Sequence, residues 1–250
     1  MEHLRRCLVA WIGAKVEEAH ARGAVLGLSG GIDSAVAAAL CREALGDNAL
    51  ALILPINSLP QDLEDARLVA EHFGIRAQVV PLEAAYGALV AALPNDLGSE
   101  RTRPLALANL KPRLRMLTLY YYANALNYLV VGTSNRSELA VGYFTKYGDG
   151  ASDILPLGGL VKRHVRQLAK HIGVPQPIIE KAPSAGLWPG QTDEGEMGVT
   201  YEQIDRYLLS GQAEPAVAHL LSTRQRLSEH KRSRPPIAPV EDFLAQGGQA

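Results

Sequence analysis

The sequence predicts an α/β fold, a doubly wound parallel sheet flanked by helices, and three observations support this. Short apolar runs alternate with helical patterns from residue 24 to residue 80, the order of elements that builds a parallel sheet with right-handed crossovers. The runs are continuously apolar, as strands are when helices cover both faces of a sheet. With 250 residues and 47% hydrophobic content, the chain suits one large domain over 1–250.

The spacing of apolar residues defines the elements in the first third of the chain. Leu4, Leu8, Ile12 and Val16 recur at helical spacing, and glycines follow the next two helices as helix-ending residues often do. The expected elements are a helix over 2–21, a strand over 24–28, a helix over 34–45, a strand over 49–54, a helix over 60–73 and a strand over 76–80.

The rest of the chain has longer irregular segments. Pro112 fits poorly inside a helix over 105–127, so that helix either begins near 112 or kinks there. The remaining expected elements are a polar loop over 94–104, a strand over 128–131, a helical turn over 136–141, a glycine-rich loop over 142–159, a helix over 161–171, a mobile loop over 182–198, helices over 201–210 and 214–231, and a loosely ordered tail over 235–250.

Composition restricts the classes of partner. A net charge of −1 argues against a general nucleic-acid binder, which carries a basic surplus. No run reaches the roughly 20 apolar residues that cross a bilayer, and no signal-peptide pattern begins the chain. Two cysteines are too few for a disulfide framework, so we expect a cytoplasmic protein in which Cys7 and Cys41 are reduced core thiols.

The segment between the first strand and the next helix has the composition of an anion site. Glycines allow backbone N–H groups to approach a ligand, and a helix N-terminus favours negative charge. Two serines add hydroxyl groups, and one aspartate provides a carboxylate for a metal that bridges phosphates. The candidate nucleotide-binding residues are Gly27, Leu28, Ser29, Gly30, Gly31, Ile32, Asp33 and Ser34.

This segment differs from two familiar phosphate loops. It lacks the Gly-Lys-Ser/Thr ending of a P-loop and the three spaced glycines of the dinucleotide fingerprint. Ser-Gly-Gly-x-Asp-Ser at 29–34 resembles the pyrophosphate loop of the N-type ATP pyrophosphatases, which cleave ATP between its α and β phosphates. That resemblance implies a Rossmann-like fold of the adenine nucleotide alpha-hydrolase type.

Downstream motifs narrow the resemblance to one family. Gly-Thr-Ser-Asn-Arg-Ser-Glu at 132–138, Phe-Thr-Lys-Tyr-Gly-Asp-Gly at 144–150, Lys-Ala-Pro-Ser at 181–184 and His-Lys-Arg at 230–232 keep their order and spacing. From about residue 20 to 234 the chain resembles NAD synthetase. The resemblance implies ATP-dependent conversion of deamido-NAD (nicotinic acid adenine dinucleotide) to NAD through an adenylated intermediate.

Two carboxylates are placed to hold magnesium. Asp33 and Glu138 each follow a strand at its carboxyl end, and parallel strands bring these ends to one edge of the sheet. Magnesium in phosphate sites takes one or two protein carboxylates. We therefore expect Mg²⁺ at Asp33 and Glu138, and the family pattern implies the same pair.

The family pattern also implies contacts to both nucleotides. It assigns ATP phosphates to Lys162 and further ATP contacts to Thr133 and Ser184, whereas Asp149 is our hypothesis for holding or deprotonating the incoming ammonium. The family usually has alanine in place of Pro112. The positions implied for deamido-NAD are Arg113, Lys146, Asp153, His230 and Lys231.

The resemblance extends to the nitrogen source and the assembly. Glutamine-using synthetases carry an additional glutaminase domain, which we do not expect in 250 residues, so direct use of ammonia is predicted. The family implies a homodimer with the dinucleotide at the interface. Two alternatives are another enzyme on the same loop, such as a tRNA-modifying or GMP-synthetase-like enzyme, and a non-enzymatic nucleotide sensor.

Overall fold

The computed structural model describes residues 1–94, 96–100, 102–188 and 190–241. Its sheet has four parallel strands in the order β3-β2-β1-β4. The chain places β2 and β3 successively on one side of β1 and then returns to place β4 on the other side. The sheet is therefore doubly wound, which confirms the predicted fold class. The strands are β1 (Gly23–Gly27), β2 (Ala49–Ile53), β3 (Arg76–Val79) and β4 (Tyr128–Val131).

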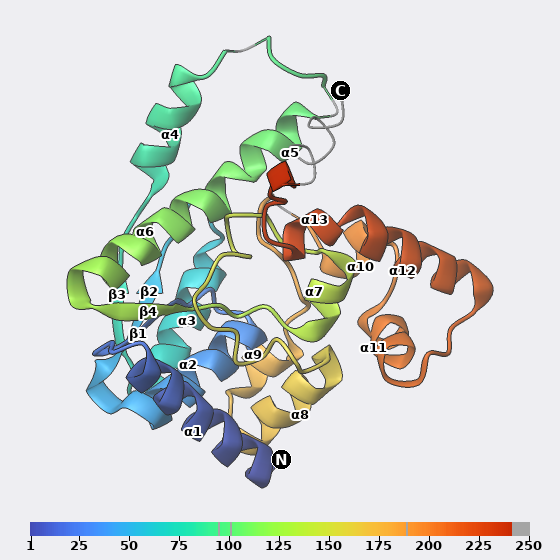
Figure 1. The fold of residues 1–250 in the computed structure, drawn as a ribbon. Helices are drawn as coiled ribbons and strands as arrows, with labels where there is room; N and C mark the ends of the chain where they lie inside the picture. Colours follow the sequence, from blue (N-terminus) through green and yellow to red (C-terminus); the bar gives the residue numbers. More distant parts are fainter. Residues whose placement is uncertain (95, 101, 189, 242–250) are drawn as a thin grey trace.

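Helices cover both faces of this sheet and form a separate group beyond its edge (Figure 1). The helices are α1 (Glu2–Glu18), α2 (Ile32–Leu45), the 3-10 turn η1 (Gly46–Asn48), α3 (Pro60–Phe73), α4 (Glu83–Ala92), α5 (Arg103–Ala108), α6 (Leu110–Leu126), α7 (Arg136–Val141), α8 (Lys162–Ile172), α9 (Gln176–Glu180), α10 (Asp193–Met197), α11 (Tyr201–Ser210), α12 (Pro215–Leu227) and α13 (Glu229–Arg232).

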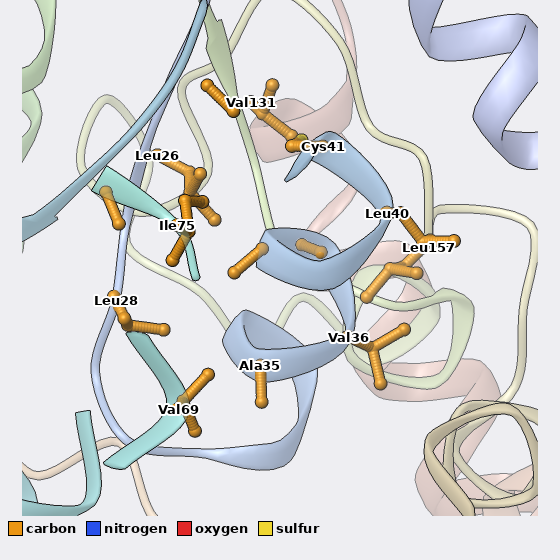
Figure 2. Packing of buried hydrophobic residues seen from close by; sticks show 14 of the residues in the cluster. Leu26, Leu28, Ala35, Val36, Leu40, Cys41, Val69, Ile75, Val131 and Leu157 are labelled. Atoms are coloured by element: carbon orange, nitrogen blue, oxygen red, sulfur yellow. The ribbon is translucent and has the colours of Figure 1, made fainter. Parts of the chain in front are cut away.

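Successive residues of each strand point to opposite faces of the sheet. Leu26 and Val131 point to one face and pack with buried residues of α1, α2, α3, α8 and α9, and Figure 2 shows this cluster around Ala35 and Cys41 of α2. Val25 and Val130 point to the opposite face and pack against α6. Both faces are thus covered, as the continuously apolar strands require.

A third apolar cluster lies outside the sheet. It joins α7 to α10, α11 and α12 through Val141, Met197, Tyr201 and Leu221. These helices extend to the right in Figure 1, beyond the carboxyl edge of β4. The cluster fixes the end of the chain to the helix that follows β4.

Several boundaries differ from those expected. The helix predicted over 105–127 divides at Asn109, and Pro112 lies in the first turn of α6, where its missing N–H removes no helical hydrogen bond. The helix predicted over 214–231 is interrupted at Ser228. The loop predicted over 182–198 contains the helix α10.

Two smaller expectations concern exposure. Cys41 is buried, but Cys7 is exposed, because Ile12 and Val16 define the buried face of α1 and Cys7 lies off it; its prediction as a core thiol was wrong. In the predicted loose tail, residues 235–241 are exposed, and residues 242–250 lie outside the described part. No helix in the described ranges is long and apolar enough to span a membrane.

Candidate active site

The predicted nucleotide loop and the predicted magnesium carboxylates meet between β1 and β4. These strands are neighbours in the sheet although β2 and β3 lie between them in the sequence. Asp33 stands in the first turn of α2, and Glu138 in the first turn of α7. Doubly wound sheets bind ligands at this kind of switch point, beyond the carboxyl ends of the strands.

The loop after β1 is a closed turn with one position that requires glycine. Gly30 has a φ of +78°, and a Cβ added there would lie 2.7 Å from the carbonyl oxygen of Asp62. The Ser34 hydroxyl accepts the Ser29 N–H at 3.2 Å and donates to the Gly31 carbonyl at 2.9 Å. The loop therefore keeps its backbone close to α3.

Lys162 joins the two carboxylates. Its Nζ lies 2.5 Å from Asp33 Oδ2 and 3.2 Å from Glu138 Oε1, and its side chain is only 2% exposed. Asp205 fixes the start of α8 by accepting the backbone N–H groups of Lys162 at 3.3 Å and Arg163 at 2.8 Å. The three residues predicted to surround the phosphates and metal are thus in direct contact.

Asn135 completes this arrangement and was missed by the sequence analysis. It is fully buried, and its side-chain amide donates to Asp33 Oδ1 at 2.9 Å. Its backbone N–H donates to Glu138 Oε2, and its Oδ1 accepts the Glu138 N–H, both at 3.1 Å. This is a capping box, and its Asn-x-x-Glu signature at 135–138 was available in the sequence.

Two further residues border the cluster and were also missed. The Tyr201 hydroxyl lies 2.8 Å from Asp193 Oδ2 and 3.1 Å from Glu138 Oε1, and its ring centroid is 4.7 Å from Lys162 Nζ. Asp193 is 5% exposed, and its Oδ1 is buried without a hydrogen-bond partner. Asp193 lies in the segment Gln-Thr-Asp-Glu at 191–194, which also fits the family resemblance, but no local pattern places it or Tyr201 at the site, because the third apolar cluster brings them there.

The charges respond to burial and to one another. Burial, together with the charge of Asp33, raises the pKa of Glu138 to about 7. Burial alone would lower the pKa of Lys162, but Asp33 and Glu138 outweigh it, so that pKa is raised. Burial also raises the pKa of Asp193. The site therefore holds more carboxylates than its single ammonium can neutralise.

This donor set fits a magnesium ion. Within the described ranges no group of three or more His, Cys, Asp or Glu side chains is arranged around a metal site. Mg²⁺ in phosphate sites needs only one or two carboxylates, since phosphate and water supply the other ligands. Asp33 and Glu138 already converge on one cation, the Lys162 ammonium.

Four of the five residues expected at the dinucleotide form a linked group. An Arg113 guanidinium N–H donates to the Lys146 carbonyl at 3.3 Å, and Lys146 Nζ donates to the His230 carbonyl at 2.5 Å. Lys231 Nζ donates to the Gly142 carbonyl at 2.8 Å. Asp153 instead accepts the Val130 N–H at 2.7 Å and the Tyr120 hydroxyl at 3.2 Å.

The remaining predicted residues occupy less constrained positions. Asp149 is exposed, and its Oδ1 accepts the Thr145 N–H at 2.9 Å. Thr133 is half-buried directly after β4. Ser184 is exposed and accepts the Gly186 N–H at 3.1 Å. No hydrogen bond in the described part of the chain joins Ser184 to the Asp33–Glu138–Lys162 cluster.

Comparisons with known proteins cover almost the whole chain. The family model described as NAD synthase matches residues 4–235. The NH3-dependent NAD+ synthetase of Carboxydothermus hydrogenoformans is 52% identical, and the match covers 92% of this chain and 94% of the relative.

Two solved structures are similar over nearly their full length. An NMN synthetase from Francisella tularensis has a TM-score of 0.89 and 41% identity, covering 95% of this chain and 98% of that one. An NH3-dependent NAD synthetase from Campylobacter jejuni has a TM-score of 0.77 and 32% identity, covering 94% and 97%.

Proposed function

The chain belongs to the NAD synthase family, and from this premise we propose that it is an ammonia-dependent NAD synthetase. It is a ligase that forms a C–N bond, using ATP to amidate deamido-NAD. Three relatives named NH3-dependent NAD+ synthetase match this chain over 94%, 95% and 96% of their own length. This favours ammonia as the nitrogen source. The alternatives of a tRNA-modifying enzyme, a GMP-synthetase-like enzyme and a nucleotide sensor are not favoured.

The reaction has two steps. A carboxylate oxygen of the nicotinate ring attacks the α-phosphorus of ATP, and the α–β phosphoanhydride bond breaks to release pyrophosphate. Ammonia then attacks the adenylated carbonyl carbon, the C–O bond to AMP breaks, and a proton leaves the nitrogen. The products are NAD, AMP and pyrophosphate.

The charge cluster carries this proposal. Bound Mg²⁺ would neutralise charge on the departing pyrophosphate, and Asp33 and Glu138 would hold it. Lys162 supplies a second cation beside these carboxylates, which stabilises negative charge that develops in the transition state. The loop from Gly27 to Ser34, with Thr133 and Ser184, binds ATP, while Asp149 holds or deprotonates the ammonium.

The linked group of cationic and polar residues binds the dinucleotide. Arg113, Lys146, His230 and Lys231 offer cationic or polar groups to its phosphates and carboxylate, and Asp153 lies beside β4. The protein is a homodimer with this surface at the interface. Exposed apolar residues of α6 support that assembly, since Leu117 is 63% and Tyr121 69% exposed. Its two free cysteines suit the cytoplasm.

The direct test measures NAD and pyrophosphate with purified protein, ATP, Mg²⁺, ammonium and deamido-NAD. We expect equal amounts of NAD, AMP and pyrophosphate, with each substrate required. Glutamine replacing ammonium without loss of rate would contradict the proposed nitrogen source. Pyrophosphate release with tRNA or with a purine nucleotide acceptor, and none with deamido-NAD, would contradict the proposed substrate.

A second candidate substrate has its own support. The NMN synthetase structure matches this chain more closely than the Campylobacter NAD synthetase does, with TM-scores of 0.89 and 0.77. The mononucleotide of nicotinic acid, which yields NMN on amidation, has the same pyridine ring and carboxylate as deamido-NAD, so it can present them to the same adenylating site. Comparing kcat/KM for this mononucleotide and for deamido-NAD decides between them.

A further inference from the structure

The Lys162 ammonium occupies the position of a counterion between the two carboxylates proposed for magnesium. Both carboxylate oxygens of Asp33 accept hydrogen bonds. Oδ1 accepts from the Asn135 amide at 2.9 Å, and Oδ2 accepts from Lys162 Nζ at 2.5 Å. Glu138 is engaged in the same way, through Oε2 with the Asn135 N–H and through Oε1 with Lys162 Nζ. A divalent cation held by both carboxylates therefore requires Lys162 to give up at least one of these contacts.

A buried ammonium that leaves its carboxylates needs another acceptor, because an unpaired buried charge costs several kcal/mol. The structure contains an unused acceptor close by. Asp193 Oδ1 is buried and has no hydrogen-bond partner, and the charge of Asp193 already helps to raise the pKa of Lys162.

Tyr201 connects the two positions of the ammonium. Its ring centroid is 4.7 Å from Lys162 Nζ, so cation–π attraction favours the ammonium over that ring in either position. Its hydroxyl lies between Asp193 Oδ2 and Glu138 Oε1, which leaves Asp193 Oδ1 as the free oxygen of that carboxylate. The hydroxyl thus orients Asp193 beside Lys162.

We propose that Asp193, oriented by Tyr201, is a positioning residue that receives the Lys162 ammonium when a divalent cation occupies Asp33 and Glu138. One ammonium N–H then bonds Asp193 Oδ1, and the other two are free to face phosphate oxygens. This inference rests on the magnesium site of the proposed function and adds to it a second, defined place for the lysine.

The test is a double-mutant cycle read out by metal binding. The affinity for Mn²⁺ is measured from the free-ion electron paramagnetic resonance signal, without nucleotide, in wild type, Asp193→Asn, Lys162→Met and the double variant. Asp193→Asn should weaken Mn²⁺ binding about tenfold, the low end of the effect of changing groups that support metal ligands. Lys162→Met should strengthen binding, because the competing ammonium is gone.

The decisive comparison is between the two backgrounds. If Asp193 acts through Lys162, Asp193→Asn has no effect on Mn²⁺ affinity once Lys162 is methionine. An equal loss in both backgrounds, or no loss in either, overturns the inference. The matched control is Glu202→Gln, which removes a charge from an exposed side chain of α11 and should leave the affinity unchanged.

Two further measurements keep the inference falsifiable if a variant does not fold. In a crystal structure of wild type with Mn²⁺ and α,β-methylene ATP, Lys162 Nζ should lie within hydrogen-bond distance of Asp193 Oδ1. Nζ remaining on both Asp33 and Glu138 overturns the inference. Wild-type protein that binds no Mn²⁺ even with α,β-methylene ATP present would instead contradict the metal site itself, and with it the metal's part in the proposed function.

Discussion

The side-chain amide of Asn135 donates to Asp33 across 2.9 Å, and both side chains belong to residues that follow neighbouring strands. The same residue forms the capping box of α7 with Glu138. Asn135 therefore holds both proposed magnesium carboxylates in one orientation while it satisfies the start of a helix. A buried side chain that hydrogen-bonds two residues from different segments is costly to change.

Replacing Asn135 with alanine should lower both stability and activity. The change removes the helix cap and leaves Asp33 Oδ1 without its donor, and we expect a loss of about 1–3 kcal/mol in the free energy of unfolding. Urea denaturation and steady-state kinetics provide the measurement. Ser99→Ala, which removes an exposed side-chain hydrogen bond, is the control; equal effects of the two changes would contradict the assigned role.

Replacing Asp33 with asparagine should reduce kcat far more than stability. The amide keeps the size of the side chain and an oxygen for Lys162, but it removes the charge proposed to hold magnesium. We expect kcat to fall by about 10²–10³-fold, the usual cost of losing one preorganised electrostatic contact. The variant should be less stable but still folded at the assay temperature, because Lys162 keeps Glu138 as a partner; a fall in activity that only follows unfolding would count against a catalytic role.

Gly30→Ala should destabilise the protein and disorder the nucleotide loop. A Cβ at this position would lie 2.7 Å from the Asp62 carbonyl oxygen and 2.8 Å from Asp65 Cβ, in a residue with φ of +78°. Gly74→Ala is the matched control, since its φ is +60° in the left-handed region but nothing lies within 4 Å of the added Cβ. A backbone cost of about 1–2 kcal/mol for an L-residue at positive φ applies to both positions, so the excess loss at Gly30, measured by denaturation, reports the steric clash.

The two cysteines should differ strongly in reactivity. Burial raises the pKa of Cys41 to about 12, so at pH 8 its thiolate fraction is about 10⁻⁴. Cys7 is exposed on α1. Iodoacetamide followed by mass spectrometry should label Cys7 alone in the folded protein and both cysteines in urea. Labelling of Cys41 at the rate of Cys7 under native conditions would show that α2 is not packed as described.

Charge introduced on the outer face of α6 should separate the proposed dimer. Leu117 and Tyr121 lie one turn apart on this helix, and each is more than half exposed, so Tyr121→Lys places a charge where apolar contact is proposed. Light scattering should report a dimer for wild type and a monomer for the variant. Leu68→Lys, a change at an exposed residue of α3, serves as the control. A wild-type monomer would refute the interface outright.

The sequence predicted the sheet and the meeting of the two carboxylates proposed for magnesium because both depend on local patterns. Continuously apolar runs identify parallel strands, and residues that follow β1 and β4 must share one edge of the sheet. Asp33 and Glu138 lie together in the structure, in contact with Lys162, which only the family resemblance had implied. Tyr201 and Asp193 were not predicted, because their position depends on the packing of α10, α11 and α12 against α7, which no local pattern encodes.

The helix boundaries show the same limit. Gly46 and Gly74 correctly marked helix ends, because each takes positive φ there. The break at Asn109 is not marked by glycine, and Pro112 alone did not decide whether a helix begins near it or kinks there. Pro112 located the irregularity, and the structure shows two helices, α5 and α6, on the two sides of Asn109.

The strand order has a consequence for how the protein is synthesised. The loop after β1 emerges from the ribosome early, but its neighbour β4 follows only after α6, and Lys162 and Tyr201 emerge later still. Contacts between segments so distant in sequence form slowly. Nascent chains that end before α11 therefore contain Asp33 and Glu138 but lack Tyr201, which contacts Glu138 and Lys162 in the folded protein. The Lys162 ammonium is thus enclosed only after α11 has been synthesised and has packed against α8.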